Sequence, residues 1–431
     1  MTFDDIKLVR EIRMHTKVIR LLFVLYFSCC IVSGLAAEKD GADFGEFDRR
    51  ARAGERLSVV FFGASLTWGA NASDPMQTSY RALIAKRLEA KYPKAHFKFF
   101  DGAIGGTGSQ LGIFRLERDV LRHKPDLVFL DFSANDGITT ADGETLASYE
   151  AIVRRIITEA KAPVVQVAFP FSWDVQRGKL EAMHRRIAHK KISKTYSTAF
   201  GDAIALCKER IESKETALKK IWPFDGVHPG DAGYVVFADA AWVAFEKAIK
   251  DKRACVAPNQ MLHGDTYLRP RRIRISSLKP LPAGWTVQPP NPVSAHFDML
   301  MSRWLDDETV AAMPKGKAEN VALLKMKFRG SMVMLFGEST EKSVKYRVLI
   351  DDKLVTREEK QGGKTVVLKE FNGAELAARV KGNCHHVQIL ATGLDPKREH
   401  TLEIQPLFTG KAGEELRLES ICVAGNARLE Q

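Results

Sequence analysis

The chain has 431 residues, of which 45% are hydrophobic and 27% are charged, and its formal net charge is +12. This composition excludes a disordered or fibrous protein, and the length suffices for two to three domains with sizeable cores. The fold therefore needs neither a metal ion nor disulfides to compensate for a small core.

The N-terminal segment has the order of a secretory signal peptide. Lys17 and Arg20 precede a long apolar run, which ends in the small residues of GLAA at position 37. Met14 is an alternative start that would leave a signal of more usual length. The apolar run also approaches the ~20 residues that span a bilayer. Residues 1–37 are therefore predicted as a signal peptide or an N-terminal membrane anchor, and the protein as secreted or periplasmic.

Charge gives an expectation about partners. Removal of residues 1–37 takes away five basic and three acidic residues, so the exported chain would carry +12 − 2 = +10. A basic exported protein favours anionic partners such as acidic polysaccharide or lipid headgroups. No nucleic-acid partner is expected, because the sequence holds no recognition motif. Contact with a membrane is expected only through the N-terminal segment. The basic run RPRRIRI at 269–275 is more typical of a solvated linker or a strand edge than of a binding patch.

Four cysteines follow the N-terminal segment, at Cys207, Cys255, Cys384 and Cys422. They form no C-x-x-C pair, which argues against a zinc site. Because export permits disulfides, the first pairings to expect are Cys207–Cys255 and Cys384–Cys422. Four buried free thiols are the alternative.

Short apolar strands alternate with amphipathic helices over residues 45–252. The strands are expected in RLSVVFF, HFKFF, DLVFLDF and PVVQVAF, and the helices in SYRALIAKRLEAKY, QLGIFRLERDVLRH, TLASYEAIVRRIITEAKA, KLEAMHRRIAHKKISKTY and AGYVVFADAAWVAFEKAI. This alternation predicts an α/β domain, in which helices cover both faces of a parallel sheet. Such sheets bind ligands beyond the carboxyl ends of their strands.

The pattern changes over residues 253–431. A proline-rich stretch is followed by runs that alternate like strands, in ALLKMKF, SMVMLFG, KYRVLIDDKLV, KTVVLKEF, HHVQILATGL, HTLEIQPL and LRLESICVAG. Many short strands at this spacing predict an all-β sandwich or jelly-roll domain, appended to the α/β domain.

Polar residues and glycines follow the first three predicted strands of the α/β domain. Ser65 follows the first strand in GASLTWG, GAIGGTGS follows the second, and Asn135 follows the third in SANDG. A hydroxyl, exposed N–H groups and an amide donor at neighbouring strand ends suit a nucleophile with an oxyanion hole. Each piece alone is also common as a helix N-cap or a turn.

One histidine has a carboxylate at a short fixed spacing: His228 follows Asp225 in WPFDGVHPGDAG. The carboxylate can accept Nδ1–H and leave Nε2 free to take a proton from a serine. The alternative is an incidental surface histidine beside a helix that Asp231 caps. His184 and His189 are expected on the surface of a basic helix, and no histidine has the spacing of a metal ligand.

Together the blocks GASLTWG, GAIGG, SANDG and DGVH resemble the SGNH hydrolase superfamily, also called GDSL-type esterases, over about residues 57–250. The resemblance implies a flavodoxin-like parallel sheet sandwiched by helices, and a serine hydrolase without a cofactor or metal. It implies Ser65 as nucleophile, His228 as general base and acid, and Asp225 as the residue that orients His228. The backbone N–H groups of Ser65 and Gly106 and the side chain of Asn135 would form the oxyanion hole.

Two positions depart from the family pattern. Ser133 stands where the family usually has glycine, and Asp101 stands where it usually has asparagine. Neither has a catalytic role by this resemblance, although Ser133 would narrow the site or alter how Asn135 is held. The resemblance does not extend to the C-terminal half.

These observations predict a secreted serine esterase that hydrolyses ester bonds through an acyl-enzyme. The appended β-rich domain and the lack of an obvious apolar lid favour O-acetyl groups on carbohydrate as the substrate. Trp285 and Trp304 would bind sugars if they are exposed, and are core residues otherwise. A lipid or general short-chain esterase is the alternative within the same class. A non-catalytic glycan-binding surface protein is the alternative of another class, because a fold does not guarantee a function.

Overall fold

The computed structural model describes residues 41–138, 143–176, 180–292, 305–313 and 321–425, which belong to one compact unit. The predicted signal peptide or anchor at residues 1–37 lies outside the described residues. Within these described ranges, no helix combines the length and the hydropathy that a membrane span requires.

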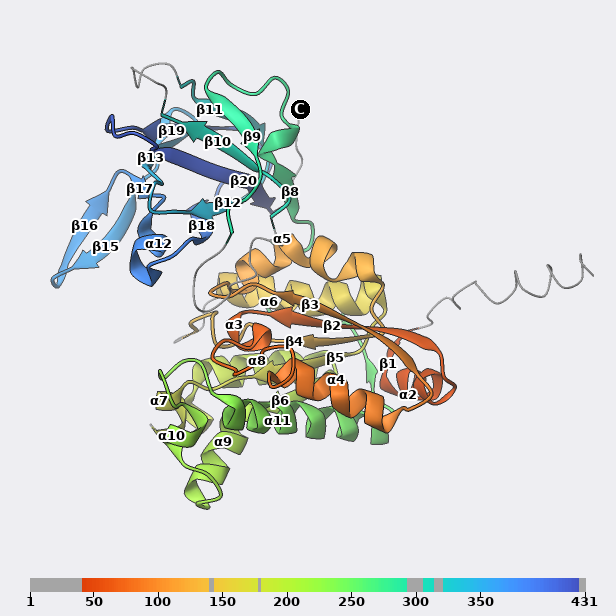
Figure 1. The fold of residues 1–431 in the computed structure, drawn as a ribbon. Helices are drawn as coiled ribbons and strands as arrows, with labels where there is room; N and C mark the ends of the chain where they lie inside the picture. The colour runs from red at the N-terminus through yellow and green to blue at the C-terminus, as the bar shows by residue number, and fades with distance from the viewer. Residues whose placement is uncertain (1–40, 139–142, 177–179, 293–304, 314–320, 426–431) are drawn as a thin grey trace, which may run out of the picture. The chain divides into compact units, whose positions relative to one another are not determined.

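The first half of this unit is built on a five-stranded parallel sheet with the order β3-β2-β4-β5-β6 (Figure 1). The strands are β2 (Arg56–Gly63), β3 (His96–Ala103), β4 (Leu127–Leu130), β5 (Val164–Ala168) and β6 (Ala199–Asp202). Numbered along the chain, the order is 2-1-3-4-5, so the flavodoxin-like prediction is confirmed. Of these five strands, the sequence pattern misses only β6, because AFGD is short and contains a glycine and an aspartate, which are rare in strands.

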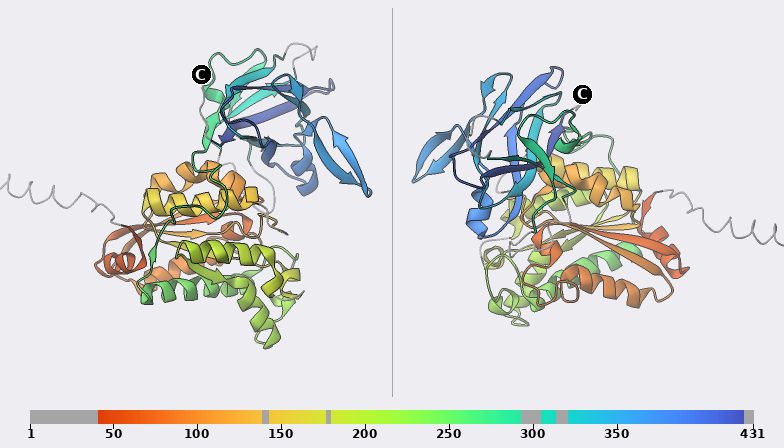
Figure 2. Two further views of the ribbon diagram at one scale, coloured as in Figure 1. Left: turned by 180° about the vertical axis from the view of Figure 1, so that it is seen from behind. Right: turned by 45° about the horizontal axis from the view of Figure 1, so that its top comes forward.

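Helices cover both faces of the parallel sheet (Figures 1 and 2). On one face α5 (Ser109–Asp119) packs against α6 (Gly143–Arg155), and on the other α4 (Tyr80–Lys91) packs against α11 (Asp231–Lys250). The first half also contains α2 (Phe44–Arg52), α3 (Ser65–Trp68), α7 (Ser172–Gln176), α8 (His184–Thr195), α9 (Ala203–Glu212) and α10 (Leu218–Ile221). Helices on both faces explain why the strands are apolar on both sides.

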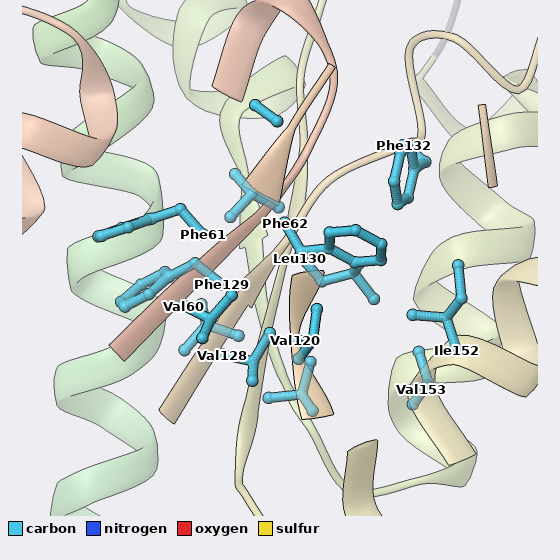
Figure 3. Packing of buried hydrophobic residues seen from close by; sticks show 14 of the residues in the cluster. Val60, Phe61, Phe62, Val120, Val128, Phe129, Leu130, Phe132, Ile152 and Val153 are labelled. Carbon is cyan, nitrogen blue, oxygen red and sulfur yellow. The ribbon is translucent and has the colours of Figure 1, made fainter. Parts of the chain in front are cut away.

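Aliphatic and aromatic side chains pack together in the core between the sheet and the helices (Figure 3). Strands direct successive side chains to opposite faces. Phe61 of β2 therefore stacks on Phe129 of β4 on one face, with ring centroids 5.2 Å apart. Phe62 packs edge-on against Phe132 on the other face, at 5.1 Å. Gly112 of α5 permits this second contact, because a Cβ there would lie 2.8 Å from the Phe132 ring.

The second half contains two antiparallel sheets. One has the order β18-β12-β20-β10-β9, with β8 also paired to β20, and the other has the order β11-β19-β13-β14, with β17 paired to β13. Their strands are β8 (Arg271–Arg274), β9 (Trp285–Gln288), β10 (Glu308–Ala312), β11 (Leu324–Phe328), β12 (Met332–Ser339), β13 (Lys345–Ile350), β14 (Lys353–Leu354), β17 (Phe371–Asn372), β18 (Cys384–Ala391), β19 (His400–Leu407) and β20 (Glu415–Ala424). Both sheets contribute to one hydrophobic core, with Leu335 and Leu418 from the first and Val348 and Ile404 from the second. The prediction of an all-β sandwich in this half is confirmed.

Smaller elements complete the described chain. They are a hairpin of β15 (Arg357–Gln361) and β16 (Lys364–Leu368), the helix α12 (Glu375–Val380), and a pair of β1 (Ala42–Asp43) with β7 (Ala254–Cys255). The basic run RPRRIRI contains strand β8, which agrees with the strand-edge interpretation. Its Arg272 is not solvated but forms a buried ion pair with Glu419.

The four cysteines among the described residues are free and buried, so both expected disulfides are wrong and the free-thiol alternative holds. Cys384 and Cys422 lie on β18 and β20, which are separated by β12. Two strand spacings amount to about 9.5 Å, more than the Cα separation of about 7 Å that a disulfide tolerates. Burial raises the pKa of the Cys255, Cys384 and Cys422 thiols to about 12, so they stay protonated at neutral pH.

Candidate active site

Ser65 lies just beyond the carboxyl end of β2, in the first turn of the short helix α3. Its side chain is only 4% exposed. The N-cap of α3 is Ala64, so the serine hydroxyl is not the cap of this helix. Gly69 ends the helix with a φ of 104°, a left-handed conformation that favours glycine. The strand therefore stops abruptly and presents a hydroxyl at the edge of the sheet.

Gly63, the last residue of β2, allows this sharp turn because it has no side chain. A Cβ at this position would lie 2.2 Å from Thr67 Oγ1 and 2.4 Å from the carbonyl oxygen of Asp131. We expect Gly63→Ala to lower the free energy of unfolding by about 1–3 kcal/mol through overpacking. Chemical denaturation measures this change, with Gly41→Ala as a control, since a Cβ at Gly41 meets nothing within 4 Å. Equal stability of the two variants would contradict the close approach at Gly63.

His228 and Asp225 come from the loop before α11 and meet Ser65 across 163 residues of sequence. His228 Nε2 lies 3.1 Å from Ser65 Oγ, and its Nδ1 lies 3.3 Å from Asp225 Oδ2. The other carboxylate oxygen, Oδ1, accepts the backbone N–H groups of Val227 and His228, each at 2.7 Å. Burial acts to raise the pKa of Asp225, but the hydrogen bonds from His228 and Val227 outweigh it and hold the pKa below its usual value. Asp225 is therefore a carboxylate at neutral pH.

Three hydrogen-bond donors lie just beyond the carboxyl ends of β2, β3 and β4. Within the described part of the chain, no hydrogen bond uses the backbone N–H groups of Ser65 and Gly106 or the side-chain amide of Asn135. Gly106 has a φ of 74°, and both Gly106 and Asn135 are exposed. They line one cavity together. The adjacent Asp136 has a structural role, because its Oδ1 accepts the N–H of Ser109 at the beginning of α5.

Ser133 and Asp101, the two departures from the family pattern, both make contacts inside the fold. Ser133 is buried; its hydroxyl donates to Asp131 Oδ1 at 3.2 Å and accepts the N–H of Phe169 at 3.3 Å. It thereby connects the carboxyl ends of β4 and β5. Asp101 accepts the N–H of Ala103 at 3.0 Å and lies 3.3 Å from Arg81.

Asp131 lies fully buried behind the site, and burial raises its pKa to about 7, with a further contribution from Asp136. Because the pKa of an unfolded aspartate is about 3.9, ionisation of Asp131 destabilises the folded state increasingly between about pH 4 and pH 7. We therefore expect Asp131→Asn to be more stable than wild type by about 1–3 kcal/mol at pH 8, with little difference at pH 4. Urea denaturation at the two pH values measures this, and a difference that does not depend on pH would contradict it.

His189 is not a surface residue, contrary to the prediction, whereas His184 is exposed as expected. The Nδ1 of His189 lies 2.6 Å from the carbonyl oxygen of Arg185, and its Nε2 lies 3.5 Å from Asp136 Oδ2. The basic residues on either side of His189 make this helix look fully exposed in the sequence. Arg185, His189 and Ile192 recur with helical spacing, and this stripe is the buried face of α8.

Asp231 begins α11 but does not cap it with its side chain. Its carboxylate accepts the N–H and the hydroxyl of Ser73, at 2.8 and 2.6 Å, and the hydroxyl of Thr78 at 2.8 Å. Tyr234, one turn further along α11, donates its hydroxyl to the carbonyl oxygen of Ala70 at 2.7 Å. The loop after the serine helix is thus fastened to the helix that follows His228, a contact that no local sequence pattern predicts.

Two cavities adjoin Gly106. One has a volume of about 150 Å³ and reaches from Asn135 to Met334 and Ile389 of the β-rich half. The other has a volume of about 330 Å³ and is lined largely by polar side chains of that half, including Arg357, Glu375 and Arg379. No three His, Cys, Asp or Glu side chains of the described chain gather as a metal ion would require.

Residues 61–236 match the GDSL-like Lipase/Acylhydrolase family. The chain contains a GDSL-like lipase/acylhydrolase domain. This acylhydrolase domain is similar to an acetylxylan esterase of Geobacillus stearothermophilus, with 26% identity over 210 residues, which cover 43% of this chain and 92% of that protein. The protein is an ester-hydrolysing enzyme.

The fold of the chain resembles a solved structure along most of its length. The crystal structure of a two-domain esterase (CEX) active on acetylated mannans, co-crystallised with mannopentaose, superposes with a TM-score of 0.69 and 20% identity. The superposition covers 90% of this chain and 95% of that chain. A second crystal structure of the same esterase gives a TM-score of 0.68. At this level of identity the likeness shows a shared two-part fold.

Proposed function

We propose that this acylhydrolase is an exported serine esterase that removes O-acetyl groups from carbohydrate. The observation that carries the proposal is the chain of contacts from Ser65 Oγ to His228 Nε2 at 3.1 Å and from His228 Nδ1 to Asp225 Oδ2 at 3.3 Å. This order of hydroxyl, imidazole and carboxylate is the one that serine hydrolases need.

In the proposed reaction, Ser65 Oγ attacks the acetyl carbonyl carbon while His228 Nε2 takes the hydroxyl proton. The negative charge on the carbonyl oxygen is stabilised by the N–H groups of Ser65 and Gly106 and by the amide of Asn135. His228 then donates its proton to the departing sugar oxygen and leaves an acetyl-serine. Water attacks this ester with His228 again as base, which releases acetate and restores Ser65.

The size and polarity of the cavities support an acetylated carbohydrate over a lipid. A cavity of about 150 Å³ is lined by Gly106 and Asn135, two of the proposed oxyanion donors, and by neither Ser65 nor His228; it would hold a group the size of acetyl rather than a long acyl chain. The second cavity at Gly106 offers charged groups from Arg357, Glu375 and Arg379, which suit the hydroxyl groups of a sugar. The relatives agree, since one is named an acetylxylan esterase and the other is described as active on acetylated mannans.

A tryptophan can stack on a sugar only where its ring is exposed, and the tryptophans of this chain differ in exposure. Trp285 is a core residue, 5% exposed, and its Nε1 donates to the carbonyl oxygen of Ala322 at 2.9 Å. It is therefore not available for stacking on a sugar, and Trp304 lies outside the described residues. Trp173 of α7 is 41% exposed, which the sequence pattern did not indicate.

Release of acetate from acetylated mannan and acetylated xylan tests this function, with tributyrin and 4-nitrophenyl acetate measured in parallel. We expect acetate from at least one polysaccharide and little hydrolysis of tributyrin. Turnover of 4-nitrophenyl acetate alone would retain the serine chemistry and remove the carbohydrate from the proposal. No turnover of any of these esters, together with no labelling of Ser65 by a fluorophosphonate, would contradict the proposed serine chemistry.

A further inference from the structure

We propose that Asn71 is a positioning residue of the active site, which holds the Asp225 carboxylate and limits how strongly it attracts a protonated His228. The inference deepens the proposed function and rests on it. It arises from a contact between the loop that follows the serine helix and the loop that carries Asp225 and His228.

The side-chain amide of Asn71 contacts both members of the second loop. Its Nδ2 donates to Asp225 Oδ2 at 2.9 Å and lies 3.4 Å from the carbonyl oxygen of His228. Oδ2 is also the oxygen that faces His228 Nδ1 at 3.3 Å. Asn71 and the imidazole therefore share one carboxylate oxygen, and Asn71 makes the shorter contact.

The backbone around Asn71 fixes where its amide points. Asn71 has a φ of 67°, in the left-handed region that asparagine, aspartate and glycine tolerate best. The carbonyl oxygen of the preceding residue, Ala70, accepts the hydroxyl of Tyr234 at 2.7 Å. Two residues later, Ser73 is bound to Asp231 through its N–H and its hydroxyl. The amide is thus presented from a loop that is anchored on both sides.

The hydrogen bond from Asn71 to Asp225 Oδ2 changes how strongly this oxygen attracts the His228 ring. A donor on Oδ2 withdraws part of the negative charge that would otherwise stabilise the imidazolium form of His228. By weakening the attraction to the imidazolium, Asn71 keeps His228 available as a base at lower pH.

Two substitutions that suit the left-handed backbone test the inference. Asn71→Gly removes the amide, and Asn71→Asp keeps the shape but replaces the donor by a second carboxylate. We expect the acid limb of the kcat/KM profile for 4-nitrophenyl acetate to move to higher pH, by about 0.5 unit for Asn71→Gly and about 1 unit for Asn71→Asp. At the pH optimum, kcat of Asn71→Gly should fall about 10-fold with KM within about two-fold of wild type.

The control is Ser73→Ala, which loosens the same loop without removing a contact to Asp225. NMR of histidine-labelled protein, with His228→Gln to assign the resonance, gives the pH at which the His228 ring titrates without requiring turnover. The inference holds if this pH rises from wild type to Asn71→Gly to Asn71→Asp while Ser73→Ala matches wild type. It is overturned if the Asn71 variants titrate as wild type does, or if Ser73→Ala shifts equally. Failure of wild type to hydrolyse any ester would count against the proposed function and leave the NMR result to decide on Asn71.

Discussion

Substitution of Ser65 by alanine is expected to lower kcat for 4-nitrophenyl acetate by about 10⁴- to 10⁶-fold, because it removes the hydroxyl on which the proposed acyl-enzyme forms. The hydroxyl is the one that lies 3.1 Å from His228 Nε2, and its side chain is 4% exposed. Loss of a single oxygen atom leaves the backbone turn around Gly63 unchanged. Thermal unfolding of the variant, followed by circular dichroism, should therefore remain close to that of wild type.

Two controls make this result specific to the nucleophile. Ser213→Ala removes an exposed serine at the end of α9, whose hydroxyl donates to the carbonyl oxygen of Arg210, and should retain full activity. The double variant Ser65→Ala/His228→Gln should be no slower than Ser65→Ala alone, because the two residues act as one unit. A Ser65→Ala protein that keeps a tenth of the wild-type kcat would exclude Ser65 as the nucleophile.

The second large effect is expected at Asn135, whose amide is free and exposed next to Gly106. Removal of one oxyanion donor costs about 10²- to 10³-fold in kcat. Because the donor acts on charge that develops only in the transition state, KM of Asn135→Ala should stay within about three-fold of wild type. Steady-state kinetics with 4-nitrophenyl acetate measures both constants.

Gln110 provides a matched control for Asn135, since its side chain lines the same cavity but comes from helix α5. We expect Gln110→Ala to change kcat by less than about three-fold. If Asn135→Ala and Gln110→Ala are equally active, the proposed oxyanion hole lacks its side-chain donor, and only the backbone N–H groups of Ser65 and Gly106 remain in that role.

Much of the fold could be predicted because burial leaves a periodic pattern in the sequence. Parallel strands covered on both faces are continuous apolar runs, as in RLSVVFF and DLVFLDF, and the helices between them keep helical spacing. Where tertiary contacts override local preference, prediction failed. AFGD forms β6 because it pairs in parallel with the neighbouring strand β5. Its glycine, Gly201, packs closely on Ala241 of α11.

The site residues also divide into those that a local motif predicts and those that only tertiary contacts bring to the site. Ser65, Asp225 and His228 were predicted from short motifs, and they lie within hydrogen-bond reach of one another. Their catalytic roles remain predictions that the substitutions above test. Asn71 and Asp231 were not predicted as site residues, because they stand in no short motif that would mark their contacts with partners more than 150 residues away. The pairing of Cys384 with Cys422 was misjudged for a related reason, since strand order, which decides their separation, cannot be read from spacing alone.

Ser65 and His228 come from opposite ends of the parallel-sheet half, so the ribosome makes them at different times. His228 is separated from Ser65 by 163 residues, so at about 5–20 residues per second it leaves the ribosome about 10–30 s later. Contacts of such long range form late in folding. Docking of α11, which ends at Lys250, also brings Asp231 and Tyr234 onto the loop after Ser65. A nascent chain therefore carries Ser65, the proposed nucleophile, before His228, the proposed base, and we expect hydrolysis only once α11, the last helix of the parallel-sheet half, is in place.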